Sequence, residues 1–408
     1  LWKNEKSIIE NQNIKIIFKD EEKLIKEINS DLKIKITSKS LNKSFANNLN
    51  NNNGRLNYNG NLKSLSKYKF SDIKNFDKAE SEIIVHNESV IFFDNKGNLL
   101  KFNDKSKLDW KKNFYTKSEK KLGPILSMSL RDDILIVADN LAKYYAIDVI
   151  SGNLIWERRN SSPINSQIKI LNDKFYIVDY QNILRCFDIN SGDELWNIQT
   201  ENSFIKSKKK LSIALSNDKI FFNNYIGDIT SVDINTGEIV WQTPTQKSSV
   251  YEDSFLLETS DIVLNNGQIF LSNNRNEFFS ISQENGFVNW KTSIDSSMRP
   301  TIIDNLIFTV TSDGFLVILE SSTGKVIRST YIFDSIKKKK LKNLKPTGFI
   351  VGVNDIYLST NKGYLIKINT MSGKSNSVIK IAGGKILRPY VSVNNLYILK
   401  SNSIIKFN

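Results

Sequence analysis

A nine-residue unit recurs along this chain and limits the folds open to it more than any other feature. The unit begins with a polar residue, has glycine at its fifth position and ends with tryptophan. Its strong copies are DVISGNLIW at 148–156, DINSGDELW at 188–196, DINTGEIVW at 233–241 and SQENGFVNW at 282–290. Weaker copies lie at 103–110, 320–328 and 369–377. Each copy reads as one strand ending on the polar residue, a turn whose glycine takes a positive φ, and a second strand ending on tryptophan.

The copies follow one another at intervals of roughly 40–50 residues, the length of a four-stranded β-propeller blade. The complete units expected on this spacing are Ser81–Tyr115, Pro124–Asn160, Pro163–Thr200, Lys210–Gln246, Thr259–Asp295, Met298–Phe333 and Lys345–Ala382. A last unit, from Lys385 to Asn408, has room for only three strands. Leu62–Phe70 resembles a fourth strand, with Tyr68 where other units have tryptophan. Pairing it with the last unit would remove an open sheet edge.

The chain is therefore predicted to be all-β, an eight-bladed β-propeller of four-stranded antiparallel blades closed by an N-terminal strand that pairs with the C-terminal blade. Residues 62–408 are expected to form this single domain, with 62–70 as the outer strand of the last blade. Residues 1–61 are expected to form a partly flexible N-terminal extension. Within it, Glu21–Asn29 has the pattern of a short helix and the asparagine run Asn47–Asn53 that of a flexible loop.

The formal net charge of +14 allows two interpretations. The lysines can be scattered over a solvated surface that is also rich in asparagine, or they can form one basic face that meets an acidic partner or an anionic membrane. The sequence has no apolar stretch of about 20 residues, the length that a membrane span needs. The chain begins with Leu1 rather than methionine, so we expect that it was processed or trimmed. Any signal peptide, or any lipid-bearing cysteine just ahead of Leu1, would then lie outside this sequence.

One connection departs from the repeat pattern. The segment 197–210, NIQTENSFIKSKKK, joins the third unit to the fourth and is longer than its equivalents. It sets Phe204 and Ile205 among lysines, which is typical of a protein-docking site, although the two apolar side chains could instead pack back onto the propeller. A second basic run, Lys337–Lys340, occupies the corresponding connection between the sixth and seventh units. Such connections share one face of a propeller, so the sequence predicts a basic docking face.

Residues suited to catalysis are scarce. His86 is the only histidine, so neither a histidine-based metal site nor a serine–histidine–aspartate triad with a spare histidine can be assembled. Glycines occur singly in turns rather than in a phosphate-binding loop. The only cysteine, Cys186, is expected to be a buried thiol that forms no disulfide within the chain. We therefore predict no catalytic residue, no cofactor and no metal site.

Two repeated residue types invite a functional interpretation but fit a structural one better. The aspartates that open the strong copies recur at one equivalent position per blade, which favours a role in the turn over a cation-binding ring. The tryptophans that end the copies are expected to pack between blades. The aspartates are Asp148, Asp188 and Asp233, and the tryptophans are Trp110, Trp156, Trp196, Trp241 and Trp290.

With these units, the chain resembles the quinoprotein-type (PQQ-like) propeller repeat family over roughly residues 55–408, and within it the BamB family of outer-membrane protein assembly factors. The narrower resemblance rests on the eight units and the strand-donating N-terminal segment. It implies a non-enzymatic periplasmic scaffold at the inner face of the outer membrane, tethered by an N-terminal lipid outside this chain. The implied partner is the set of POTRA domains of the barrel-inserting subunit. The chain would act as a monomer within a complex, without nucleic acid.

The resemblance also implies partner-binding residues. A leucine–leucine–arginine cluster in the connection to the fourth blade falls, counted from Trp196, on Ile205, Ser207 and Lys208. Ser207 departs from the apolar pattern, and Lys208 keeps the charge without the planar guanidinium group. Acidic residues of the connection to the fifth blade add further candidates. With the neighbouring Phe204, the predicted partner-binding set is Phe204, Ile205, Ser207, Lys208, Glu252, Asp253 and Glu258.

Two other functions remain open. One is a PQQ-dependent quinoprotein dehydrogenase, since enzymes of that superfamily resemble this chain in repeat form. They carry a vicinal cysteine pair against the cofactor and acidic ligands for a metal ion, whereas this chain has a single cysteine. The other is a propeller interaction module with a different partner, for example in organising the cell envelope or in ribosome biogenesis.

Overall fold

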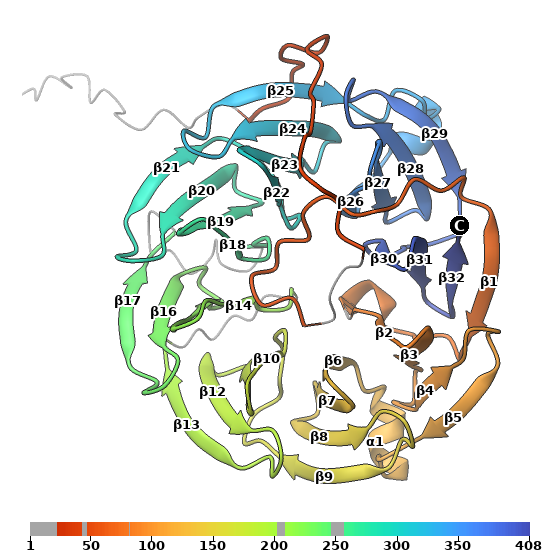
Figure 1. The fold of residues 1–408 in the computed structure, drawn as a ribbon, viewed down its shortest axis with the longest axis vertical. Coiled ribbons are helices and arrows are strands. Elements are labelled where there is room, and N and C mark those ends of the chain that lie inside the picture. Colours follow the sequence, from red (N-terminus) through yellow and green to blue (C-terminus); the bar gives the residue numbers. More distant parts are fainter. Residues whose placement is uncertain (1–22, 43–46, 81, 202–208, 246–256) are drawn as a thin grey trace, which may run out of the picture.

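The computed structural model describes residues 23–42, 47–80, 82–201, 209–245 and 257–408. Eight four-stranded antiparallel sheets are arranged as blades around a central axis (Figure 1). Seven sheets consist of four strands that follow one another in the chain, whereas the eighth combines the last three strands with the first. The predicted eight-bladed β-propeller is therefore confirmed, including its closure by the N-terminal strand.

In every blade the first strand lies nearest the axis and the fourth lies on the outer rim (Figure 1). From the centre outwards, the first blade consists of β2 (Ile84–His86), β3 (Ser89–Phe93), β4 (Leu99–Phe102) and β5 (Leu108–Lys112), and the second of β6 (Leu126–Arg131), β7 (Ile134–Asp139), β8 (Lys143–Asp148) and β9 (Leu154–Arg159). The third blade consists of β10 (Lys169–Leu171), β11 (Lys174–Val178), β12 (Ile183–Asp188) and β13 (Glu194–Gln199), and the fourth of β14 (Ile213–Leu215), β15 (Lys219–Asn223), β16 (Ile229–Asp233) and β17 (Ile239–Thr243). The fifth blade consists of β18 (Val263–Asn265), β19 (Gln268–Asn273), β20 (Glu277–Ser282) and β21 (Val288–Thr292), and the sixth of β22 (Thr301–Ile303), β23 (Leu306–Val310), β24 (Phe315–Glu320) and β25 (Val326–Tyr331). The seventh blade consists of β26 (Pro346–Val351), β27 (Asp355–Thr360), β28 (Tyr364–Asn369) and β29 (Ser375–Lys380), and the eighth of β30 (Tyr390–Ser392), β31 (Asn395–Lys400), β32 (Ser403–Phe407) and β1 (Ser64–Lys69). The connections contain the short helices η1 (Phe76–Lys78), α1 (Lys117–Leu122) and α2 (Lys338–Leu341).

The closing strand β1 is held by its backbone and by one large side chain. Tyr68 lies opposite Ile404 in the antiparallel pair of β1 and β32, and its side chain is fully buried. The ring of Tyr68 contacts Phe102 of the first blade edge to face, with ring centroids 5.7 Å apart. The strand therefore completes the eighth blade and packs against the first, which removes the only open junction in the ring.

The middle strands of the blades carry continuous apolar runs. In β11, Phe175–Val178 is buried throughout, because neighbouring blades cover both faces of the sheet. In the outer strand β13, by contrast, exposed and half-buried residues alternate. Cys186 of β12 is fully buried, and burial raises the pKa of its thiol to about 12. The expectation of a buried thiol is confirmed.

The glycine and the tryptophan of the repeat meet across each blade boundary. The ring of Trp156 lies against Gly192 of the next blade, and its indole Nε1 donates to the carbonyl of Ile189 at 2.9 Å. A Cβ on Gly192 would lie 2.6 Å from the ring, and the φ of 75° at this residue already disfavours a side chain. The predicted inter-blade packing is therefore confirmed. The same contact joins Trp110 to Gly152, Trp196 to Gly237, Trp241 to Gly286 and Trp290 to Gly324.

The repeated aspartates stabilise the turns, as predicted. The carboxylate of Asp148 accepts a hydrogen bond from the backbone N–H of Ser151 at 2.7 Å and another from its hydroxyl. These bonds hold the pKa of Asp148 below its usual value. Asp188 and Asp233 each accept two backbone N–H groups of their own turns. A carboxylate that is already bound in this way serves its turn rather than a shared cation.

Arg328 replaces tryptophan in the sixth blade and makes an equivalent contact. Its guanidinium lies against Gly373 of the seventh blade and donates to the carbonyls of Thr370 and Met371. It also donates to the carbonyl of Leu32 at 2.9 Å, so this blade boundary includes the N-terminal segment. The side chain is fully buried, and burial lowers its pKa to about 10.

The asparagine run Asn47–Asn53 is not a flexible loop, contrary to the prediction. It lies across the centre of the ring (Figure 1), and its side-chain amides hydrogen-bond to successive first strands. Asn47 both donates to and accepts from the backbone of Ile170 in β10, and Asn52 does the same with Ile302 in β22. First strands are sheet edges with unpaired N–H and C=O groups, and an amide side chain can satisfy both.

Asn51 is the most buried residue of this run. Its amide nitrogen donates to the carbonyls of Ile213 and Ile262 at 2.9 and 2.8 Å, which joins the fourth and fifth blades. Its side chain is fully buried. After the run, the backbone N–H of Leu56 donates to the carbonyl of Val351 in the seventh blade. The part of the extension that runs from residue 47 to residue 56 therefore packs against the inner strands of the propeller.

The predicted helix at Glu21–Asn29 is also wrong over the part that the structure describes. Residues 23–29 form no helix. Instead, Ile28 exchanges both backbone hydrogen bonds with Ser329 of the outer strand β25, at 3.0 and 2.9 Å. The outer edge of β25 has backbone groups free to pair with another segment. The helical pattern of residues 21–29 is local and does not show that this edge lies beside them.

Candidate functional site

The candidate site is the central channel together with the face on which it opens. All first strands run in the same direction, so the connections that lead into them meet on one side of the ring. We call this side the channel-mouth face and define it, within the described chain, by residues 209–210, 257–261, 297–299, 337–345 and 385–388. The turns that carry the repeat glycines lie on the opposite side. The asparagine run lies behind the inner end of the channel.

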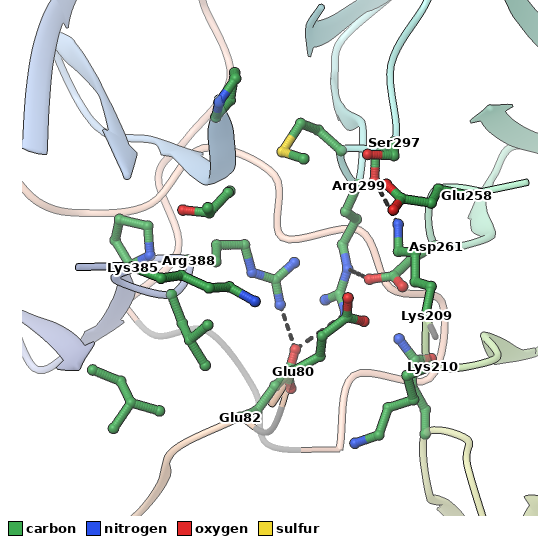
Figure 2. Close-up of a pocket in the computed structure, with 18 of the residues that line it drawn as sticks. Glu80, Glu82, Lys209, Lys210, Glu258, Asp261, Ser297, Arg299, Lys385 and Arg388 are labelled. Carbon is green, nitrogen blue, oxygen red and sulfur yellow. Dashed lines mark hydrogen bonds and ion pairs between the residues drawn. The ribbon is translucent and has the colours of Figure 1, made fainter. Parts of the chain in front are cut away.

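The structure places only one of the predicted partner-binding residues. Glu258 lies at the channel mouth, where its backbone N–H is bound by Asn274 and its side chain is exposed (Figure 2). The other six lie outside the described residues: Phe204, Ile205, Ser207, Lys208, Glu252 and Asp253.

The two lysine runs behave differently. Lys337–Lys340 is exposed on the channel-mouth face, at the start of α2. Lys209 and Lys210, the described end of the first run, instead line the channel. The Lys209 ammonium donates to the carbonyl of Ser297 (Figure 2). The prediction that both runs project outward from one face therefore holds for the second run but not for these two residues.

A cavity of about 620 Å³ occupies the channel. Its acidic lining residues are Asp77, Glu80, Glu82, Glu258 and Asp261, and its basic ones are Lys169, Lys209, Lys210, Arg299, Lys345, Lys385 and Arg388. Basic groups therefore outnumber acidic ones within the described lining. The volume lies in the range of small-molecule sites.

Two arginines and two carboxylates form an ion network inside the cavity (Figure 2). Glu82 accepts hydrogen bonds from Arg299, at 3.1 Å, and from Arg388. Arg299 also donates its Nε to Asp261. Burial opposes ionisation of both acids, but the arginines outweigh it and hold the pKa of each carboxyl below its usual value. The network thus joins the first, fifth, sixth and eighth blades.

Lys169 of β10 lies at the inner end of the cavity and is 5% exposed. Its ammonium donates to the side-chain oxygen of Asn51 at 2.6 Å and to the carbonyl of Asn48. Burial lowers its pKa to about 7; Arg299 acts in the same direction, and Glu82 opposes both. The asparagine run therefore contacts the charged lining directly.

Sequence reasoning did not find these channel residues, although they share one signal. Glu82, Lys169, Asp261, Arg299 and Arg388 each stand at or just before a first strand, at one position per blade. They are far apart in the sequence and have no common motif. Only the closure of the ring brings them together.

Other kinds of site are not found in the described chain. Over those residues, no group of three or more histidine, cysteine, aspartate or glutamate side chains is arranged to hold a metal ion. Neither is any helix there long and apolar enough to cross a membrane. His86 makes a 3.3 Å contact with Asp133 of the next blade and is not among the residues that line the channel cavity.

The ring of four-stranded blades, with a glycine–tryptophan contact at successive blade boundaries, defines a β-propeller of the PQQ-like repeat class. Within this class, the chain belongs to the family described as outer membrane protein assembly factor BamB, whose model matches residues 95–330. No curated protein sequence matches the chain significantly.

Solved structures share the fold at low sequence identity. BamB from Moraxella catarrhalis superposes with a TM-score of 0.69 at 16% identity, covering 85% of this chain and 100% of that one. The computationally designed protein Ika8 gives a TM-score of 0.63 at 8% identity, covering 83% and 99%. Sqt1 from Saccharomyces cerevisiae gives 0.59 at 11% identity, covering 87% and 99%. At such identities these likenesses concern the fold alone.

Proposed function

We propose that this protein is a non-enzymatic scaffold of outer-membrane β-barrel protein assembly. It acts in the periplasm, at the inner face of the outer membrane, and binds POTRA domains of the barrel-inserting subunit. The observation that carries the proposal is membership of the BamB family over residues 95–330. The complete coverage of the Moraxella catarrhalis BamB fold agrees with it.

The channel-mouth face is the proposed docking surface. It carries the exposed lysines Lys338, Lys339 and Lys340 of α2 and the exposed Glu258. The proposed contacts at 204–208 and 252–253 lie outside the described residues, and the sequence assigns them to connections that lead into first strands. Charged rims of this kind steer association and set specificity, while apolar residues such as Phe204 and Ile205 supply the binding energy.

Affinity for purified POTRA domains tests the docking surface. The double substitution Ile205→Asp with Lys208→Glu should weaken binding by about tenfold or more, because it removes an apolar anchor and reverses a charge. Lys325→Glu is the matched control, because it also reverses one lysine charge but lies in an exposed turn on the opposite face. Equal affinities for the double variant and the unsubstituted protein would rule out this docking site. No binding by the unsubstituted protein would favour a different partner.

The proposal that the protein is not a quinoprotein dehydrogenase can be tested separately. Titration with pyrroloquinoline quinone and Ca²⁺ should give neither a saturable absorbance change nor dye-linked turnover, because the chain offers one cysteine and that thiol is buried. Turnover in this assay would overturn the scaffold proposal in favour of a quinoprotein dehydrogenase.

A further inference from the structure

Several basic side chains that line the channel have N–H groups that donate no hydrogen bond to any described acceptor. A guanidinium has five N–H donors, yet within the described chain the only acceptor of Arg388 is Glu82. An ammonium has three, and Lys169 uses two of them, on Asn48 and Asn51. Lys210 has no hydrogen-bond acceptor or carboxylate partner for its ammonium among the residues that the structure describes. These donors line one cavity.

The charges of the same cavity are unbalanced. Glu82 and Asp261 offset the two arginines of the ion network, Arg299 and Arg388. Lys169 and Lys210 then add two positive charges, and neither forms an ion pair with any described carboxylate. Burial lowers the pKa of both ammonium groups, which is the response expected of cations that lack a close counter-ion.

We propose that the channel is a binding site for a small, multiply charged anion, bearing carboxylate or phosphate groups. The anion would accept hydrogen bonds from Lys210 and Arg388 on the walls and from the remaining donor of Lys169 at the inner end. The cavity of about 620 Å³ exceeds what a single halide ion needs and suits a molecule of metabolite size. This site lies inside the ring and does not depend on the proposed docking of POTRA domains.

Among the residues that the structure describes, the asparagine run separates the cavity from the far side of the ring. It lies behind the inner end of the cavity, so entry is from the channel-mouth face. Several carboxylates at and inside this entrance disfavour weakly charged anions, so the ligand needs at least two negative charges to gain from the donors inside. These carboxylates belong to Asp77, Glu80 and Glu258.

Isothermal titration calorimetry with citrate and with tripolyphosphate, at pH 6.5 and low ionic strength, tests the proposal. At least one of the two probes should bind saturably to the full chain. A response to citrate alone would identify a carboxylate ligand, and a response to tripolyphosphate alone a phosphate ligand; both support the site. If neither probe bound saturably below about 10 mM, the proposal would be overturned.

A matched pair of variants separates the channel from general attraction to a basic protein. Lys210→Gln removes a charge without breaking a hydrogen bond among the described residues, and should weaken binding by roughly tenfold. Lys325→Gln removes the same charge from the opposite face and should leave binding unchanged. Equal weakening by the two substitutions would show non-specific binding and refute the site.

Binding should also depend on pH. Affinity should fall from pH 6.5 to pH 8.5, because Lys169, whose pKa is about 7, loses its proton over this range. The charged groups facing the two ammonium groups are Glu80, Glu82, Asp261, Arg299 and Arg388. Glu82 and Asp261 are held ionised and the arginines stay charged, so Lys169 dominates the change among these protein groups. The probes also gain charge over this range, so the change is compared with that of Lys169→Met, in which the ionisation of the probe is the same. Equal pH dependence of the two proteins would contradict the assignment.

Discussion

At the scale of single residues, two independent constraints require glycine in the repeat: a positive φ and a close contact with a tryptophan ring. Gly192 has a φ of 75°, which L-residues rarely adopt, and its Cα lies against the ring of Trp156. The turn alone explains the first constraint and is visible in the sequence. The second arises only when neighbouring blades stack.

Comparing two glycines tests these constraints separately. Gly267 has a nearly identical φ of 73° but no neighbouring atom within 4 Å of an added Cβ. Gly267→Ala should cost about 1–2 kcal/mol of unfolding free energy from backbone strain alone. Gly192→Ala should cost about 1–3 kcal/mol more, because the tryptophan must move. Urea denaturation of both variants measures the difference. Equal losses would mean that the ring contact contributes nothing.

At the scale of elements, the N-terminal segment has two structural roles that its composition does not reveal. Strand β1 completes the eighth blade, and the asparagine run binds the edges of the first strands. Both follow from the same property of a propeller, which leaves backbone groups unpaired wherever a blade ends. The strand could be predicted, because it has an alternating pattern and the last blade lacks one strand. The run could not, because repeated polar residues look alike whether solvated or buried.

Removing one amide tests the role of the run. Asn51→Ala should lower the free energy of unfolding by about 2–4 kcal/mol, because it removes the side-chain donor to the carbonyls of Ile213 and Ile262 and one of the two acceptors of the Lys169 ammonium. Asn59→Ala, at an exposed position of the same extension, should change it by less than about 0.5 kcal/mol. Thermal unfolding followed by circular dichroism compares the two. Similar melting temperatures would mean that the run does not stabilise the ring.

At the scale of the whole molecule, the channel concentrates charge where eight blades converge. Each blade contributes little, but closing the ring places arginines, lysines and carboxylates around one axis. The stability of the protein should therefore depend on pH through groups in the channel.

Lys169 sets the direction of this dependence. Its pKa is about 7 in the folded protein, against about 10.4 in the unfolded chain. Between these values the unfolded chain binds the extra proton, so stability should rise with pH above 7, by up to about 1.4 kcal/mol per unit. Below pH 7 both states are protonated, and this contribution to the slope disappears. Urea unfolding between pH 7 and 8.5 measures it.

The measurement stops at pH 8.5 because the Cys186 thiol would oppose the rise at higher pH. Its pKa is raised in the folded protein, so the unfolded chain loses the thiol proton first and stability falls. Lys169→Met is the informative variant and should show a smaller rise than the unsubstituted protein. Lys210 and Lys385, whose pKa values burial also lowers, would supply the remaining slope. An unchanged slope in Lys169→Met would exclude Lys169 as its source.

By itself, the sequence determined the fold class, the count of blades and the closing strand, because turns and strand periodicity are local and the repeat presents them many times over. It also determined the roles of the aspartates and tryptophans. Tertiary structure alone decided the burial of Asn48, Asn51 and Asn53, the inward position of Lys210 and the ion network around Glu82. These depend on contacts between residues up to 306 positions apart, such as Glu82 and Arg388, which meet only when the chain has come full circle.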